Sequence, residues 1–120
     1  MTLNKYQIIF YETSSAQCPV DHFLDTLQIK VRAKAEKWIE KLEQHGPNLP
    51  RPYADMVVGK IRELRIIFGS NHYRFLYFFF GKKIVLTHGF IKKTDKVPLQ
   101  EIQRAESYMT DFLTRYQGVN

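Results

Sequence analysis

Three consecutive strand-like runs with short turn signals between them constrain this chain more than any other feature. The runs cover residues 61–68, 73–80 and 83–92, and each is rich in β-branched and aromatic residues. Gly69-Ser70-Asn71 separates the first two runs, and Gly81-Lys82 separates the last two. Connections of this length and composition favour β-hairpins. The pattern therefore predicts an antiparallel β-meander.

The flanking segments predict one further strand and three helices. Residues 6–11 are rich in β-formers, and Pro19 suits the first turn of a helix. Over residues 29–44, apolar residues recur at helical spacing until Gly46-Pro47 ends the pattern. Pro98 begins a last helix. The order β-α-α-β-β-β-α predicts a single α+β domain over residues 1–120, an antiparallel sheet with its helices packed on one face.

Composition excludes several classes of protein. The one cysteine, Cys18, cannot build a disulfide framework, and no Cys/His spacing resembles a zinc site. We therefore expect no metal and no cofactor. The longest apolar run, residues 75–80, is too short to span a bilayer, and residues 1–14 lack the apolar core of a signal peptide. These features predict a cytoplasmic protein without a membrane partner.

The positive charge is concentrated in one part of the chain. The net charge of the whole chain is +6, whereas residues 60–96 alone hold nine Lys and Arg against two acidic residues. Three of these lysines, at 92, 93 and 96, cluster where the third strand-like run ends. The segment predicts a surface that faces an anion, with nucleic acid as the leading partner. For the lysine cluster, the alternative is a solvated turn.

The first hairpin brings two of these cations together. If Gly69-Ser70 forms a two-residue turn, Arg65 lies directly opposite Arg74. Like charges opposite each other on a sheet are unfavourable by up to about 1 kcal/mol, so the pair favours an anion between the two guanidinium groups. The alternative is that the arginines extend into solvent or pair with Glu63 and Asp95.

The aromatic run 73–80 also has two interpretations. Both of its faces are apolar or aromatic, which is typical of a central strand covered on both sides. The alternative is that some rings, including that of Tyr73, form a platform for RNA bases.

The face that carries His88 depends on the second turn. A two-residue Gly81-Lys82 turn pairs His88 with Phe75, on the face opposite to Arg74, whereas a loop one residue longer pairs it with Leu76, on the arginine face. Histidine transfers protons readily near neutral pH. A structural role is the alternative.

Three short elements resemble those of a known family. They are "ELR" at residues 63–65, "YR-x-x-Y" at 73–77 and "HGF-x-KK-x-x-K-x-P" at 88–98. In this order, and with the predicted element order, they resemble the RelE/HigB toxin superfamily, and most of all its phage-derived RelE-like, HigB-type branch. The resemblance covers nearly the whole chain.

The resemblance implies the toxin of a type II toxin–antitoxin system and a ribosome-dependent mRNA endonuclease that works without a metal. In such enzymes the ribose 2′-hydroxyl attacks the adjacent phosphate, and basic side chains stabilise the charge that develops. The implied partners are the ribosome, mRNA and a cognate antitoxin, expected to be a HigA-like helix-turn-helix protein.

The resemblance also implies roles for individual residues. Arg74 matches the family's phosphate-clamping sheet arginine, Arg65 a basic catalytic residue, and Lys93 a basic residue after the last strand. His88 matches the acid/base histidine of some HigB-type members. The tyrosine that RelE uses near its C-terminus has no counterpart, since Leu99 falls near that position. Around this catalytic set, the expected RNA-binding residues are Lys60, Arg62, Tyr73, Lys92 and Lys96.

Three other functions remain open. A ParE-like toxin acts on gyrase and has the same fold and basic character without needing catalytic residues. A non-enzymatic RNA-binding module would use the same cations and rings for binding alone. The third is an inactive relic of the toxin.

Overall fold

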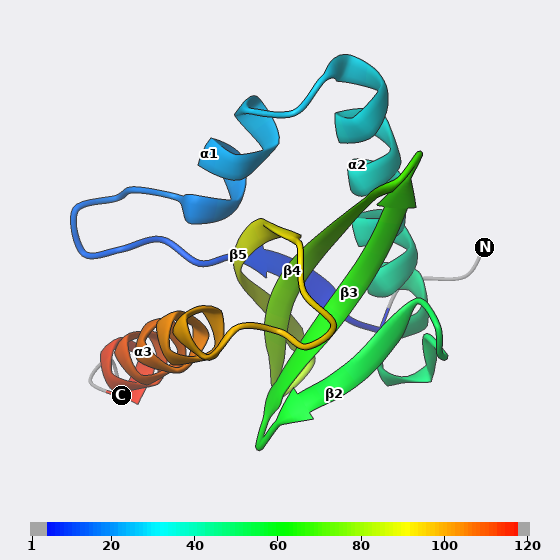
Figure 1. The fold of residues 1–120 in the computed structure, drawn as a ribbon. Helices are drawn as coiled ribbons and strands as arrows, with labels where there is room; N and C mark the ends of the chain where they lie inside the picture. The colour runs from blue at the N-terminus through cyan, green and yellow to red at the C-terminus, as the bar shows by residue number, and fades with distance from the viewer. Residues whose placement is uncertain (1–4, 118–120) are drawn as a thin grey trace.

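The computed structural model describes residues 5–117, which form a five-stranded mixed sheet with three helices (Figure 1). Strands β3 (Ile61–Phe68), β4 (Asn71–Phe80) and β5 (Lys83–Lys92) are antiparallel neighbours in the sheet. The predicted meander and the α+β class are therefore confirmed. Across the sheet the strand order is β1-β5-β4-β3-β2.

The two edge strands differ from the prediction of a purely antiparallel sheet. Strand β1 (Gln7–Phe10) pairs with β5 in parallel, because the chain leaves β1 through two helices before it returns to the sheet. Strand β2 (Ala54–Val58) was not predicted, and it pairs antiparallel with β3. Its Met56 is 60% exposed, so the segment lacks the buried apolar alternation that marks a strand in a sequence.

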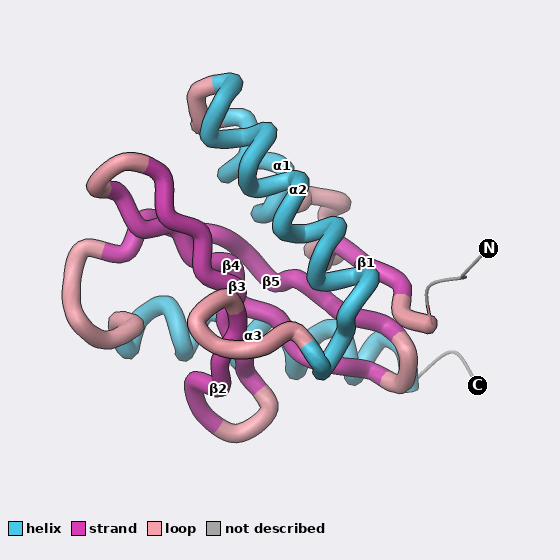
Figure 2. Tube along the Cα trace, turned by 90° about the vertical axis from the view of Figure 1, so that its right-hand side faces the viewer, coloured by secondary structure: helices cyan, strands magenta, loops and turns pink. Residues whose placement is uncertain are grey.

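The helices cover both faces of the sheet rather than one (Figure 2). Helix α1 (Pro19–Asp25), helix α2 (Ile29–His45) and the short 3₁₀ turn η1 (Gly46–Asn48) precede the β2–β5 strands, and α3 (Leu99–Gln117) follows them. Side chains of α1 and α2 share one core cluster, and those of α3 belong to two others. No helix within residues 5–117 is long and apolar enough to cross a membrane.

Strand β4 explains why the one-face prediction was wrong for α3. Its Phe75 and Tyr77 pack in the core under α1 and α2, whereas Leu76 and Phe78 pack against α3. A strand that is apolar on both faces needs a layer on each side. The interpretation of residues 73–80 as a covered central strand is thus confirmed.

A β-bulge decides the face of His88. The β4–β5 turn is short, and Tyr77 pairs with Leu86, but the register then shifts so that Leu76 pairs with His88. An extra residue in one strand of a pair reverses the faces of the residues beyond it. His88 therefore lies on the same sheet face as Arg74, although the turn itself is the two-residue kind.

His88 connects the sheet to α3. The residue is 2% exposed, and its Nε2 lies 3.1 Å from Glu101 Oε1 on α3. Its Nδ1 lies 3.1 Å from the Thr87 hydroxyl, and its ring stacks on Phe90. Burial lowers the pKa of His88 below its ordinary value, against the opposing effect of the Glu101 carboxylate. The imidazole is consequently neutral near pH 7 and hydrogen-bonded to Glu101.

Gly89 lets α1 lie close to β5, because it has no side chain. We predict that Gly89→Ala lowers the free energy of unfolding by about 1–3 kcal/mol. A Cβ at this position would lie 2.8 Å from Phe75 Cε2 and would overlap the ring of Phe23 on α1. Urea denaturation would measure the loss in free energy of unfolding. Because the overlap involves Phe23, the double variant with Phe23→Leu should lose less than the sum of the single variants. Strict additivity would contradict this packing account.

We predict that acidification destabilises the protein through His88. The unfolded chain takes up a proton at the ordinary histidine pKa of about 6.5, whereas the folded chain takes it up at a lower pH. The stability that His88 contributes is therefore complete above about pH 6.5 and is lost as the pH falls toward the folded-state pKa. Thermal unfolding between about pH 8 and about pH 5 should show a steeper decline for the wild type than for His88→Gln, which keeps a donor but does not titrate. Equal slopes would contradict the prediction.

Candidate functional site

Two arginines on neighbouring strands form the centre of the candidate site. Arg65 in β3 lies directly opposite Arg74 in β4, in the register that the two-residue turn predicts. Arg74 is 5% exposed, whereas the Arg65 side chain is 29% exposed. One guanidinium group is thus enclosed by protein, and the other reaches the surface.

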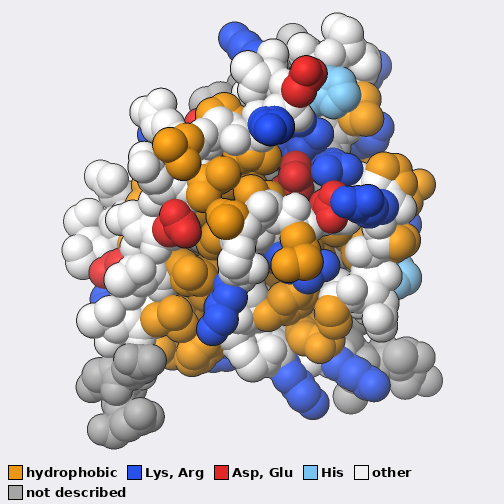
Figure 3. Space-filling view, turned by 60° about the horizontal axis from the view of Figure 1, so that its bottom comes forward, with side chains coloured by type: hydrophobic (Ala, Val, Ile, Leu, Met, Phe, Trp, Pro, Cys, Tyr) orange, Lys and Arg blue, Asp and Glu red, His pale blue; other side chains and the backbone are white. Residues whose placement is uncertain are grey.

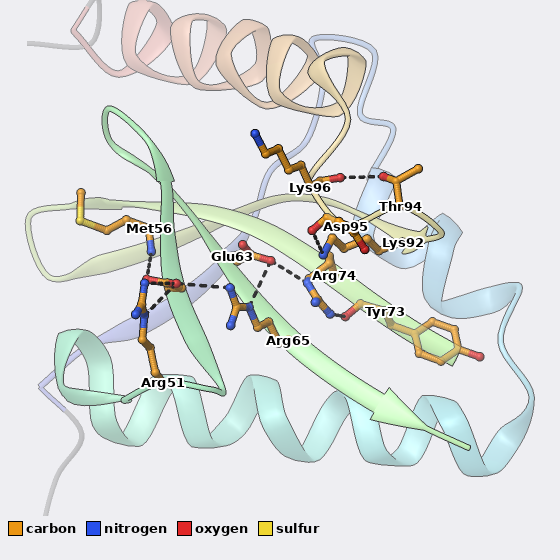
Figure 4. A network of polar contacts seen from close by, with 11 residues as sticks. Arg51, Met56, Glu63, Arg65, Tyr73, Arg74, Lys92, Thr94, Asp95 and Lys96 are labelled. Carbon is orange, nitrogen blue, oxygen red and sulfur yellow. Dashed lines mark hydrogen bonds and ion pairs between the residues drawn. The ribbon is translucent and has the colours of Figure 1, made fainter. Parts of the chain in front are cut away.

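Acidic side chains hold both guanidinium groups in place (Figure 4). The Glu63 Oε1 atom lies 2.6 Å from Arg74 Nε and 3.5 Å from Arg65 Nε. Asp55 in β2 accepts a hydrogen bond from Arg65 Nη2 at 3.2 Å. The alternative in which the arginines pair with Glu63 and Asp95 is therefore confirmed for Glu63, but the second acid is Asp55 rather than Asp95. Glu63 is itself 5% exposed, so a buried carboxylate separates the two cations.

Two of the three guanidinium nitrogens of Arg74 are held by protein atoms. Burial lowers the pKa of Arg74 below its ordinary value, while Glu63 opposes the shift, and an arginine in a protein remains protonated. Its Nη1 donates to the Tyr73 carbonyl at 3.3 Å. No residue within 5–117 hydrogen-bonds Nη2. The group therefore presents a terminal nitrogen to an anionic ligand.

A cavity of about 510 Å³, here the basic cleft, opens beside Arg74 between the β3–β4 turn and the loop after β5. Its lining consists of Ser70, Asn71, His72, Arg74, Ile91, Lys92, Lys93, Thr94 and Asp95. In the loop, Lys92 Nζ donates to the Asp95 carbonyl at 2.7 Å, and the Thr94 hydroxyl donates to the Lys96 carbonyl at 2.7 Å. These bonds shape the loop that carries Lys93. The cleft thus brings Arg74 together with two of the predicted lysines.

A second cavity of about 240 Å³, here the aromatic pocket, adjoins the basic cleft. Its lining consists of Lys34, Trp38, Pro52, Tyr53, Arg65, Ile67, His72 and Arg74. His72 and Arg74 line both cavities. Arg74 therefore stands between a cavity that contains Arg65 and one that contains Lys93. Seen in space-filling form, one part of the surface gathers Lys, Arg, Asp and Glu side chains around a histidine (Figure 3).

The structure places the other predicted residues outside both cavities. Lys60 is exposed in the β2–β3 turn, and Lys96 is exposed just beyond the cleft lining. Arg62 faces the α2 side of the sheet, with its guanidinium 5.7 Å from an aromatic ring of β4. Tyr73 is 5% exposed in the core beneath α1 and α2. His88 is enclosed beneath α3, where it binds Glu101 rather than either cavity.

Several cavity residues were missed in the sequence. His72 lies two residues before Arg74 and so shares its face of β4, a signal that the alternation of a strand contains. Lys34 on α2 reads as part of a solvated helix face, yet its Nζ donates to the Ile67 carbonyl. Tyr53 sits in a proline-rich loop where no periodicity applies. Among residues 5–117, no three His, Cys, Asp or Glu side chains lie together in a way that suits a metal ion.

Residues 22–110 match the family described as phage-derived protein Gp49-like (DUF891), and this range contains every residue that lines the two cavities. No curated protein matches the chain. The matched range is more than half of the 120 residues. The chain therefore belongs to the Gp49-like family of phage-derived proteins, a family of RelE-like toxin type that implies a cognate antitoxin as partner.

Proposed function

We propose that this protein is the toxin of a type II toxin–antitoxin pair and cleaves mRNA on the ribosome without a metal ion. The observation that carries the proposal is the position of Arg74, a buried guanidinium held by Glu63 at the junction of two cationic cavities. Glu63 and Asp55 hold the two guanidinium groups, whereas Arg74 Nη2 has no hydrogen-bond partner within residues 5–117. An RNA phosphate supplies the acceptor for this nitrogen.

In the proposed reaction, the ribose 2′-oxygen attacks the adjacent phosphorus and the bond to the 5′-oxygen breaks. The products are a 2′,3′-cyclic phosphate and a 5′-hydroxyl, so one proton leaves the 2′-oxygen and one is delivered to the 5′-oxygen. Arg74 and Lys93 stabilise the added negative charge on the phosphate oxygens, a contribution that is often the largest in such sites. Arg65 binds the same phosphate group or its neighbour from the side of the aromatic pocket.

His72 is the imidazole best placed to transfer these protons. It lines both cavities beside Arg74 and its side chain is exposed to them. His88 keeps its predicted catalytic role only if α3 moves, because its ring is enclosed and its Nε2 is bound to Glu101. We therefore assign proton transfer to His72 and expect His88 to act through folding.

The predicted RNA-binding residues outside the two cavities have other roles in the proposed complex with RNA and the ribosome. Lys60 and Lys96 are exposed and suit the RNA or ribosomal backbone, where positive charge raises affinity without reading sequence. Arg62 and Tyr73 lie on the far side of the sheet, so we expect any effect of these two to come through folding. The proposed antitoxin is a HigA-like helix-turn-helix protein, and the proposed compartment is the cytoplasm.

We predict that Arg74→Lys slows mRNA cleavage by about 10²-fold or more, because a lysine ammonium cannot bind Glu63 and also keep the position of the free Arg74 Nη2. Lysine also retains a cation beside Glu63, so the variant should fold. The measurement is single-turnover cleavage of a reporter mRNA on purified ribosomes. Lys82→Ala, which removes an exposed cation from the β4–β5 turn, should cleave at the wild-type rate. Wild-type cleavage by Arg74→Lys would rule out the proposed clamp.

The same preparation distinguishes a ParE-like toxin. If the wild-type protein leaves mRNA intact and inhibits supercoiling by gyrase, the protein is a ParE-like toxin.

We predict that His72→Ala slows cleavage by about 10²-fold or more while leaving stability unchanged, since general acid–base groups contribute on this scale. His22→Ala, at an exposed histidine of α1, is the matched control and should have no effect. The same cleavage assay, paired with thermal unfolding, checks both variants. If His72→Ala cleaves normally and His88→Gln does not, while both remain folded, the proton-transfer assignment returns to His88.

A further inference from the structure

The aromatic pocket contains features that the cleavage chemistry does not use. The rings of Trp38 on α2 and Tyr53 before β2 are stacked, with centroids 4.5 Å apart and planes 21° from parallel. Tyr53 is 41% exposed, and Ile67, which also lines the pocket, is 51% exposed. Several apolar and aromatic side chains that line one pocket and remain exposed to water are typical of a ligand site.

The position of Tyr53 is set before any ligand arrives. Its backbone N–H donates to the Pro50 carbonyl at 3.0 Å, and its carbonyl accepts from the Arg65 N–H at 2.8 Å. The loop that carries the ring is therefore attached to β3 beside the catalytic arginine. A preset ring costs little ordering entropy on binding, which favours recognition of a flat partner.

The charges around the pocket indicate the class of that partner. Arg65 and Arg74 border the pocket together with Lys34 and His72, whereas its walls are aromatic or aliphatic. This arrangement fits a molecule with a planar face and an adjacent anion, because every nucleobase has a π-face and every nucleotide a phosphate. The volume of about 240 Å³ lies just below the usual range for small-ligand sites, so it suits one base and not a longer segment.

We propose that the aromatic pocket binds the base of a single nucleotide of the RNA, with its phosphate at Arg74. The inference rests on the proposed function and extends it by stating which cavity each part of the RNA strand occupies. Because Arg74 and His72 belong to both cavities, the strand passes from the aromatic pocket, over Arg74, into the basic cleft. The base stacks against the exposed ring of Tyr53. An apolar side chain of the antitoxin is a different occupant, disfavoured because it would cover Arg65, Arg74 and Lys34 without offering them a hydrogen-bond acceptor.

The only tryptophan of the chain, Trp38, reports on the pocket directly. We would titrate the full-length protein with adenosine 5′-monophosphate, ribose 5-phosphate and inorganic phosphate, following Trp38 fluorescence and measuring affinities by calorimetry. The nucleotide should quench Trp38 and bind about tenfold or more tightly than ribose 5-phosphate, which carries no base. Tyr53→Ala should remove this difference, and Tyr53→Phe should keep it. Tyr116→Ala, at an exposed tyrosine of α3, is the matched control and should behave as wild type.

The outcomes separate this inference from the proposed function. If ribose 5-phosphate binds as tightly as the nucleotide and mRNA is still cleaved, the base pocket is wrong and the cleavage site stands. If no phosphate compound binds and mRNA stays intact, the proposed function is wrong and the base pocket falls with it. If Tyr53→Ala binds the nucleotide normally but loses the antitoxin, the pocket accepts a peptide side chain, which also overturns the inference.

Discussion

The shared carboxylate of Glu63 is the interaction on which the candidate site depends. Two guanidinium groups face each other across β3 and β4, and Glu63 Oε1 approaches the Nε atoms of both. Removing one partner of a buried ion pair costs about 3–5 kcal/mol, so neither Glu63 nor Arg74 changes without consequence for folding. The same contact aims Arg74. With Nε held by Glu63 and Nη1 by the Tyr73 carbonyl, Nη2 is the nitrogen left for a ligand at the junction of the two cavities.

The two-sided core explains why so little of the sheet surface is available for function. Phe75 and Leu76 are both fully buried because helices cover both faces of β4, so only the ends of the central strands remain open. The basic cleft lies at one such end, where the β3–β4 turn meets the loop after β5. Within the motif at residues 88–98, the first residues pack in the fold and the later residues line the basic cleft. Gly89 admits α1 and His88 binds α3, whereas Lys92 and Lys93 line the cavity.

The sequence predicts those parts of the fold that local rules determine. Turn composition sets the β3–β4 register, so the opposition of Arg65 and Arg74 follows without coordinates. The face of His88 does not follow, because a bulge within the strands reverses it and no residue type marks the bulge. Strand β2 and the side that α3 covers depend on tertiary pairing. Tyr53 reaches the site from a loop with no periodicity, which is why the aromatic pocket could not be predicted.

The acidic residues also explain how two cations lie side by side in a stable site. Asp55 and Glu63 compensate the charge of Arg65, whose side chain is still 29% exposed and therefore accessible to another anion. The Arg65–Asp55 contact is longer and less buried than the Arg74–Glu63 contact, so replacing it by a phosphate costs less. Arg74 is different, since its partner Glu63 is buried and their contact is short at 2.6 Å. In the proposed function, one arginine thus stays fixed while the other exchanges partners, so the site binds RNA without losing the interaction that holds the strands together.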